Sequence, residues 1–130
     1  SAQDSEKKRP SREQLAELQA RHIAGTLALD DATAKKFVDA YRDYQQEVWN
    51  SDASMRKKEN QSLTDAEIEK NIKERFARSR KLIDIREKYY DVYRDFLSPK
   101  QIQRVYELEK QVMKRFENKA GNKRMPQRRR

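Results

Sequence analysis

Cysteine is absent from this chain of 130 residues, which excludes disulfide bonds and thiolate chemistry. Glycine occurs only twice and proline three times, too few turn-forming residues for a protein built from β-strands. No apolar run approaches the ~20 residues that a membrane-spanning helix needs. These absences favour a helical protein without a membrane span.

Large apolar residues are also scarce. The chain is 41% charged and 35% hydrophobic, and leucine, isoleucine, valine and phenylalanine together number 23. With a net charge of +9, this composition is close to that of disordered chains. All 23 residues nevertheless lie between Leu15 and Phe116. We therefore expect a folded segment between two polar ends.

The positive charge is distributed just as unevenly. Residues 118–130 contain six lysines or arginines and no acid, and residues 1–12 contain four bases and two acids. The remaining residues, 13–117, thus have a net charge of only +1. The sequence predicts a disordered N-terminal segment over 1–10, a single helical domain over 11–117 and a disordered basic tail over 118–130.

Apolar residues recur at helical spacing in four segments. This pattern predicts an all-α fold of four amphipathic helices. A polar linker, "NSDASMRKKENQS", separates the second segment from the third. The predicted helices run from about Ser11 to Ala28, from Asp30 to the mid-fifties, from Thr64 to about Phe96, and from Ser98 to about Glu117.

The stretch "LSPKQIQRVYELE" at residues 97–109 specifies a helix entry in detail. Ser98 suits the N-cap, and Gln101 can complete a reciprocal capping box with it. Pro99 falls at the first helical position, where its missing N–H costs nothing. Leu97 and Ile102 are spaced as a hydrophobic staple. Two similar entries are "LTDAEI", with Leu63, Thr64, Glu67 and Ile68, and the looser "LDDATA", with Leu29, Asp30, Thr33 and Ala34.

"LSPKQ" resembles the LTxxQ motif of the Spy/CpxP family of periplasmic proteins, with Leu97, Ser98 and Gln101 at the motif positions. The family carries two copies, and the first would begin at Leu29. That copy departs from the pattern, because Asp30 replaces the hydroxyl residue and Thr33 replaces glutamine. The resemblance covers most of residues 15–117.

The resemblance implies an all-α fold built on a long helical hairpin that pairs into a cradle-shaped homodimer. It implies a periplasmic, ATP-independent chaperone or envelope-stress protein whose partners are unfolded or partly folded proteins. Some relatives instead regulate a two-component sensor. The chain begins without methionine, so we expect that a signal peptide has been removed. A homodimer is also expected because helices this long in so polar a chain leave apolar stripes to cover.

Six tyrosines and one tryptophan are conspicuous in so polar a chain. Tyrosine offers apolar area with a polar end, and an aromatic face edged by lysine and arginine could hold many different clients. The simpler interpretation is that these rings fill the core and the dimer interface. The candidate client-binding residues are Tyr44, Trp49, Tyr90 and Tyr93.

No residues are spaced as a catalytic or metal site. His22 is the only histidine, and there is no cysteine nucleophile or glycine-rich phosphate loop. We therefore predict a protein that is not an enzyme and has no metal or cofactor.

The basic tail supports the competing hypotheses. Its six bases could bind nucleic acid or lie near anionic lipid headgroups. The alternatives to a chaperone are thus a helical adaptor or nucleic-acid-associated protein and, as the resemblance implies, a regulatory module for a two-component sensor. Nucleic acid is not the expected partner, because the helical body is almost neutral.

Overall fold

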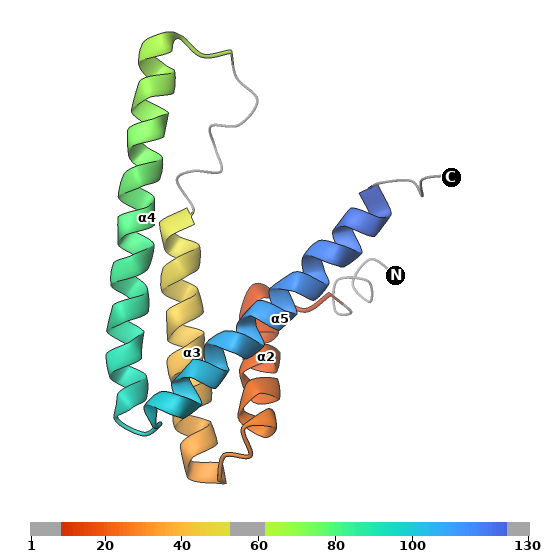
Figure 1. Ribbon diagram of the computed structural model, residues 1–130. Coiled ribbons are helices and arrows are strands. Elements are labelled where there is room, and N and C mark those ends of the chain that lie inside the picture. Colours follow the sequence, from red (N-terminus) through yellow and green to blue (C-terminus); the bar gives the residue numbers. More distant parts are fainter. Residues whose placement is uncertain (1–8, 53–61, 125–130) are drawn as a thin grey trace. The chain divides into compact units, whose positions relative to one another are not determined.

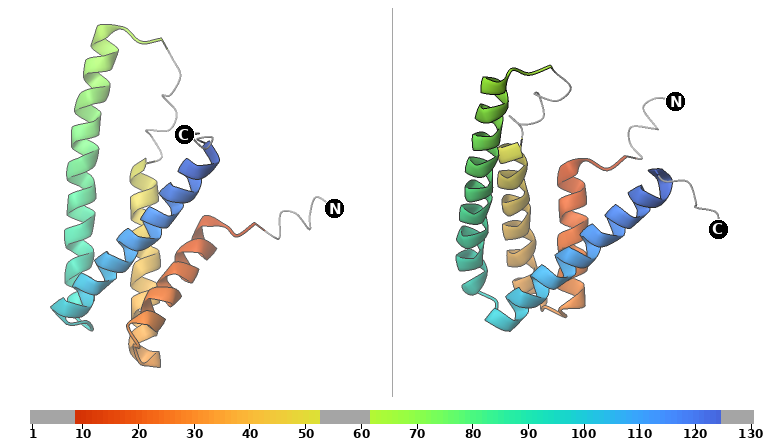
Figure 2. Two further views of the ribbon diagram at one scale, coloured as in Figure 1. Left: turned by 45° about the vertical axis from the view of Figure 1, so that its right-hand side comes forward. Right: turned by 45° about the horizontal axis from the view of Figure 1, so that its top comes forward.

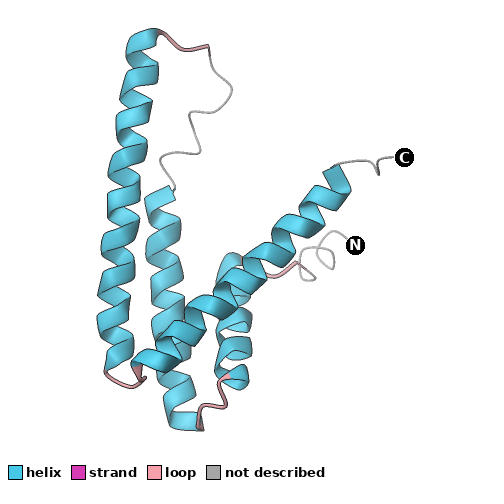
Figure 3. Ribbon diagram, viewed as in Figure 1, coloured by secondary structure: helices cyan, strands magenta, loops and turns pink. Residues whose placement is uncertain are grey.

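The computed structural model describes residues 9–52 and 62–124, and these residues form four helices and no strand (Figures 1 and 3). The predicted all-α fold is therefore confirmed for this part of the chain. The helices are α2 (Arg12–Thr26), α3 (Asp31–Asp52), α4 (Asp65–Arg94) and α5 (Pro99–Arg124).

The chain divides into two compact units, Ser1–Phe96 and Leu97–Arg130. The first unit contains α2, α3 and α4, and the second contains α5. The prediction of one domain over residues 11–117 stays a prediction. The predicted disordered segment over 1–10 lies almost wholly outside the described residues.

The predicted helices agree with the observed ones except at the C-terminal end. Helix α5 continues to Arg124, beyond the expected end near Glu117. Residues 118–124, which we assigned to a disordered tail, are therefore helical, and residues 125–130 lie outside the described residues. The difference has a physical reason, because this stretch is rich in lysine and arginine. Both are good helix formers, and cations are favoured near a helix C-terminus.

Helices α3 and α4 form an antiparallel hairpin. Glu47 in α3 contacts Lys88 and Tyr89 in α4, and Asp52, at the end of α3, contacts Arg78. Helix α2 packs against α3, the first helix of the hairpin. The buried side chains of this first unit are Ala20, Ile23, Ala24, Phe37, Val38, Ala40, Tyr41, Ile85, Tyr89 and Tyr93.

Helix α4 is longer than the helix it pairs with. It has 30 residues against 22 in α3, and its first half continues past the C-terminal end of α3 (Figures 1 and 2). The last described contact between the two helices joins Asp52 to Arg78. Residues 65–77, about 20 Å of helix, therefore lie beyond the end of α3.

In the second unit, one row of apolar side chains is buried. Leu97, Ile102, Val105 and Leu108 are each no more than 4% exposed. Burial ends farther along the same helix, since Met113 is 59% exposed.

The turn between α2 and α3 places a non-glycine residue in a left-handed conformation. Ala28 has a φ of 56°. The Leu29 N–H donates to the Ala24 carbonyl at 3.1 Å, and the Ala28 N–H donates to the Gly25 carbonyl at 3.0 Å. These two bonds make a Schellman motif, in which the position of Ala28 is usually glycine.

Candidate functional site

The motif residues at the start of α5 form the predicted capping box. The Ser98 hydroxyl accepts a hydrogen bond from the Gln101 N–H at 3.1 Å, and the Gln101 side-chain oxygen accepts from the Ser98 N–H at 2.9 Å. Leu97 and Ile102 are both buried, as expected for residues flanking the box. The geometry satisfies helix-end N–H groups, and nothing in it acts on a substrate.

The degenerate copy before α3 caps its helix in a different way. The Asp30 carboxylate accepts from the Thr33 N–H at 2.8 Å, while Leu29 is half-buried. This bond holds the pKa of Asp30 below its usual value. Asp30 thus takes the capping part of the hydroxyl residue, and both the N–H and the side chain of Thr33 bond to its carboxylate.

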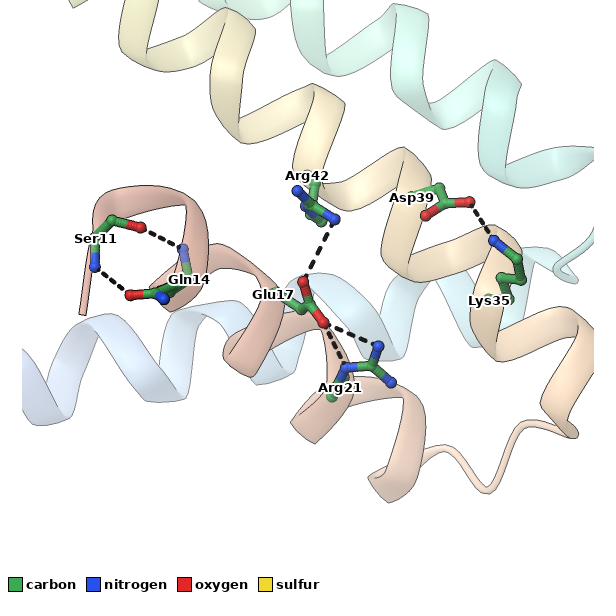
Figure 4. Close-up of polar contacts among 7 residues, drawn as sticks. All are labelled: Ser11, Gln14, Glu17, Arg21, Lys35, Asp39 and Arg42. Carbon is green, nitrogen blue, oxygen red and sulfur yellow. Dashed lines mark hydrogen bonds and ion pairs between the residues drawn. The ribbon is translucent and has the colours of Figure 1, made fainter. Parts of the chain in front are cut away.

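A full capping box also starts α4, where Thr64 and Glu67 bond reciprocally. Another one, which we did not predict, starts α2 (Figure 4). The Ser11 hydroxyl accepts from the Gln14 N–H at 3.1 Å, and Gln14 accepts from the Ser11 N–H at 2.7 Å. The sequence signal was present as "SREQ", the pattern of serine followed three residues later by glutamine.

The aromatic residues form a continuous network inside the first unit rather than one exposed face. Adjacent rings lie 5.5 to 6.4 Å apart between centroids. Separations of this size are typical of stabilising aromatic pairs. The network consists of Phe37, Tyr41, Tyr44, Tyr89, Tyr93 and Phe96.

This arrangement decides between the two interpretations for part of the aromatic set. Tyr93, which we named as a client-binding candidate, is 3% exposed, so its assignment to a binding surface is corrected to the core. Tyr44 is half-buried and contacts Tyr41 and Tyr89. Tyr90 is also half-buried, and its hydroxyl accepts from Arg94 at 3.1 Å. Apolar periodicity could not distinguish core tyrosines from surface ones, because the buried Tyr89 and Tyr93 and the half-buried Tyr90 lie within about one turn of α4.

A polar cluster joins α3 to α4 beside these rings. The Glu47 carboxylate accepts from the Lys88 ammonium at 2.7 Å and from the Tyr89 hydroxyl at 2.6 Å. These bonds, Lys88 first, hold the pKa of Glu47 below its usual value. Burial, reinforced by the bond to Glu47, raises the pKa of Tyr89, which keeps its hydroxyl a donor. The cluster fixes the register of the hairpin.

Trp49 is the most exposed of the candidate client-binding residues, at 38%. The Arg12 guanidinium in α2 lies 3.7 Å from the centre of its ring. Leu15 and Leu18 follow Arg12 at three-residue steps along α2, so Leu15 is the neighbour of Arg12 on that helix and Leu18 is the neighbour of Leu15. They are 47% and 61% exposed. We call Arg12, Leu15, Leu18 and Trp49 the α2–α3 surface.

Arginine side chains are also present elsewhere along this pair of helices (Figure 4). The Glu17 carboxylate accepts from Arg21, one turn later in α2, and pairs with Arg42 of α3 at 3.4 Å. The two helices are therefore joined by an ion pair as well as by the stacking of Arg12 on Trp49. Arg12 thus places a cation on an exposed aromatic ring of this pair of helices.

A second exposed apolar set lies on α4. Ile68, Ile72 and Phe76 are spaced by four residues and are 43%, 46% and 60% exposed. All three belong to the part of α4 that extends beyond α3. Ile83 follows on the same helix at 56%. We call Ile68, Ile72 and Phe76 the α4 stripe.

The described residues hold neither a cluster that could ligate a metal ion nor a helix that could span a membrane. No group of three or more histidine, cysteine or carboxylate side chains converges there. His22 is exposed on α2. Within the same residues, no helix combines the length and apolarity that crossing a bilayer requires.

Comparisons with protein-family models, with curated proteins and with solved structures found no match to this chain.

Proposed function

We propose that the protein is an ATP-independent periplasmic chaperone of the Spy/CpxP kind, which binds unfolded or partly folded proteins. The observation that carries the proposal is the α2–α3 surface. Three large apolar side chains stand exposed there in a chain that has few of them, and an arginine stacks on the tryptophan. Arg12 links Trp49 to Leu15, its neighbour on α2, and exposed apolar side chains that lie together mark interaction sites.

The chemistry of this surface fits many partners rather than one. Apolar contact has no directional requirement, so different unfolded segments can satisfy it. Arginine adds attraction for acidic segments and stacks on aromatic side chains. A surface of this kind needs no nucleotide to bind or to release its partner. The "LSPKQ" motif adds independent support, since it resembles the family's own signature.

The test is suppression of aggregation of several unrelated clients without ATP. We expect the wild-type chain to suppress aggregation, and the triple variant Leu15→Ser, Leu18→Ser, Trp49→Ser to need about tenfold more protein for the same effect. Loss of ~1.4 kcal/mol of apolar contact weakens binding by that factor. Circular dichroism would verify that the variant folds.

Met113→Ser is the matched control, because it removes an equally exposed apolar side chain from α5. It should retain suppression. If the wild-type chain fails with all clients, the chaperone proposal is wrong. If the control loses as much activity as the triple variant, the α2–α3 surface is not the binding site.

A further inference from the structure

A short stretch of α4 combines exposed apolar side chains with a concentration of positive charge. Residues 70–83 read "KNIKERFARSRKLI" and contain six bases and one acid. Ile72 and Phe76 of the α4 stripe lie in this stretch and are 46% and 60% exposed, and Ile83 at its end is 56% exposed. The stretch therefore offers a partner both apolar contact and positive charge.

The apolar side chains of the stretch lie on one face of the helix. At about 100° per residue, Phe76 and Ile83 are turned only about 40° and 20° from Ile72 around the helix axis. Ser79, a small and exposed residue, lies about 20° to the other side of Ile72. The three large side chains thus form a narrow apolar row along α4.

Bases border this row on both sides. Lys73 and Arg80 are turned about 100° and 80° from Ile72 in one direction, and Arg75 is turned about 60° in the other. All three are exposed, and within the described residues no carboxylate forms an ion pair with them. The acid of the stretch, Glu74, is turned about 160° away. We define the α4 cationic face as Ile72, Phe76 and Ile83 together with Lys73, Arg75 and Arg80.

Acidic residues limit this face at both ends. Glu69 before it and Glu87 after it are each turned about 60° from Ile72, and both are exposed. Ile68 lies beside Glu69 in sequence and is therefore not included. The face extends from Ile72 to Ile83, about 16 Å along the helix.

The geometry of the face fits a flat partner better than a peptide. Ile72 and Phe76 belong to the stretch of α4 beyond the end of α3, so α3 forms no groove with them (Figure 2). Peptides that bind as helices are usually held in an apolar groove. A single amphipathic helix, in contrast, can lie in the plane of a bilayer surface, with its apolar row inserted and its bases beside the headgroups.

We propose that the α4 cationic face binds the surface of an anionic phospholipid bilayer. Its apolar row inserts between the headgroups, and its three bases lie against the lipid phosphates. Binding of such a helix increases both with the apolar area inserted and with the attraction between its bases and anionic lipids. The inference goes beyond the chaperone proposal and does not depend on it.

Labelling at single cysteines tests which side of α4 enters the bilayer, because the native chain has no cysteine. Ser79→Cys lies within the cationic face. Ala77→Cys is its matched control, since both residues are exposed and are turned about 160° from each other. When phosphatidylglycerol vesicles are added to the full chain, the emission of an environment-sensitive fluorophore should move to shorter wavelength at position 79 but not at position 77. Equal shifts at both positions, or none at position 79, would overturn the inference.

Charge variants need controls of equal charge, because residues 110–130 contain nine bases that attract the same vesicles. The double variant Lys73→Gln, Arg80→Gln should bind about 25-fold more weakly, since each base beside an anionic surface contributes about fivefold. Lys70→Gln, Lys81→Gln removes the same charge from the opposite side of α4, where salt screens it, and should cost less than about threefold. Vesicle sedimentation measures both. Equal losses would show that the net charge of the chain, rather than this face, attracts the lipid, and would overturn the inference.

Two further measurements separate insertion from simple attraction of charge. Phe76→Ser should weaken binding to phosphatidylglycerol vesicles by about tenfold, because it removes the largest apolar side chain of the face. Phosphatidylcholine vesicles, which have no net charge, should shift the label at position 79 only slightly. Unchanged binding of Phe76→Ser, or an equal shift with phosphatidylcholine, would contradict the proposal. A shift with polyglutamate but not with phosphatidylglycerol vesicles would identify an acidic polypeptide as the partner instead.

Discussion

At the scale of single residues, Glu47 has the most informative environment. Its carboxylate accepts from one cation and one phenol across the α3–α4 hairpin, and both bonds stabilise its charged form. A partly exposed ion pair of this kind contributes modestly to stability. The bond to the buried Tyr89 matters more, because a buried hydroxyl without a partner is costly.

Glu47 should make the stability of the protein depend on pH. Its pKa is lower in the folded chain than its ordinary value of 4.5, so its contribution is complete above that pH and is lost as the pH falls through the folded pKa. We expect the melting temperature to fall between about pH 5 and pH 3. Glu47→Gln keeps an acceptor for Tyr89 but cannot titrate. The melting temperature of this variant should therefore fall less over the same pH range.

Asp39→Asn is a suitable control for that experiment, because Asp39 belongs to an exposed pair with Lys35 on one helix (Figure 4). It should follow the wild-type pH dependence. Some acid sensitivity should remain in Glu47→Gln as well, since hydrogen bonds also lower the pKa values of Asp30 and Glu67. Identical acid profiles for Glu47→Gln and the wild-type chain would disprove a role for Glu47.

At the scale of elements, helix ends are the best-specified features of this molecule. Three of the four described helices begin with a complete capping box, and an aspartate caps α3. Capping residues of this kind each contribute about 1 kcal/mol to stability. In a chain with a small core, capping at several helix ends supplies some of the stability that apolar burial does not provide.

The C-terminal end of α2 is less favourable than its start. Ala28 adopts a left-handed conformation that costs an L-residue roughly 1–2 kcal/mol, and glycine adopts it freely. Ala28→Gly should therefore raise the free energy of unfolding by about 0.5–1 kcal/mol after the extra entropy of the unfolded glycine is subtracted. Urea denaturation measures the change.

Gly25→Ala gives an independent comparison in the same turn of helix. A Cβ at this position would meet no atom within 4 Å, and alanine is the better helix former by about 1 kcal/mol. This variant should also be stabilised, but through helix propensity. If Ala28→Gly were destabilised while Gly25→Ala was stabilised, the strain attributed to Ala28 would be refuted.

At the scale of the whole molecule, charge and core occupy different parts of the chain. Residues 110–130 contain nine bases and one acid, so they account for +8 of the net charge of +9. The buried side chains of the described residues all lie between Ala20 and Leu108. Charge and apolar burial are thus separable by mutation.

Deleting residues 125–130 should exploit this separation. The deletion removes three arginines, so retention on heparin should decrease. The number of ionic contacts obtained from the salt dependence of heparin binding should fall by about three. The melting temperature should stay within about 2 °C, because all buried side chains of the described residues precede the deleted segment. Suppression of aggregation should be retained. Loss of suppression on deletion would favour the adaptor or nucleic-acid hypothesis over the chaperone proposal.

The sequence by itself determined the helices, because their signals are local. Apolar periodicity predicted the four segments, and "LSPKQ" and "LTDAE" predicted two capping boxes to the residue. The capping box at Ser11 was equally local, and its signal was overlooked. The exception was the end of α5, where a basic composition was interpreted as disorder although the same residues favour a helix.

Only the tertiary structure decided which apolar side chains are covered. Tyr93 and Phe76 belong to one helix and both continue its apolar pattern, yet the first is 3% exposed and the second 60%. The difference arises because α3 ends opposite Arg78, and periodicity within α4 contains no information about the length of its neighbour. Likewise, the stacking of Arg12 on Trp49 joins residues 37 positions apart, which only the packing of α2 on α3 brings together. Capping depends on neighbours in sequence, whereas burial depends on neighbours in space.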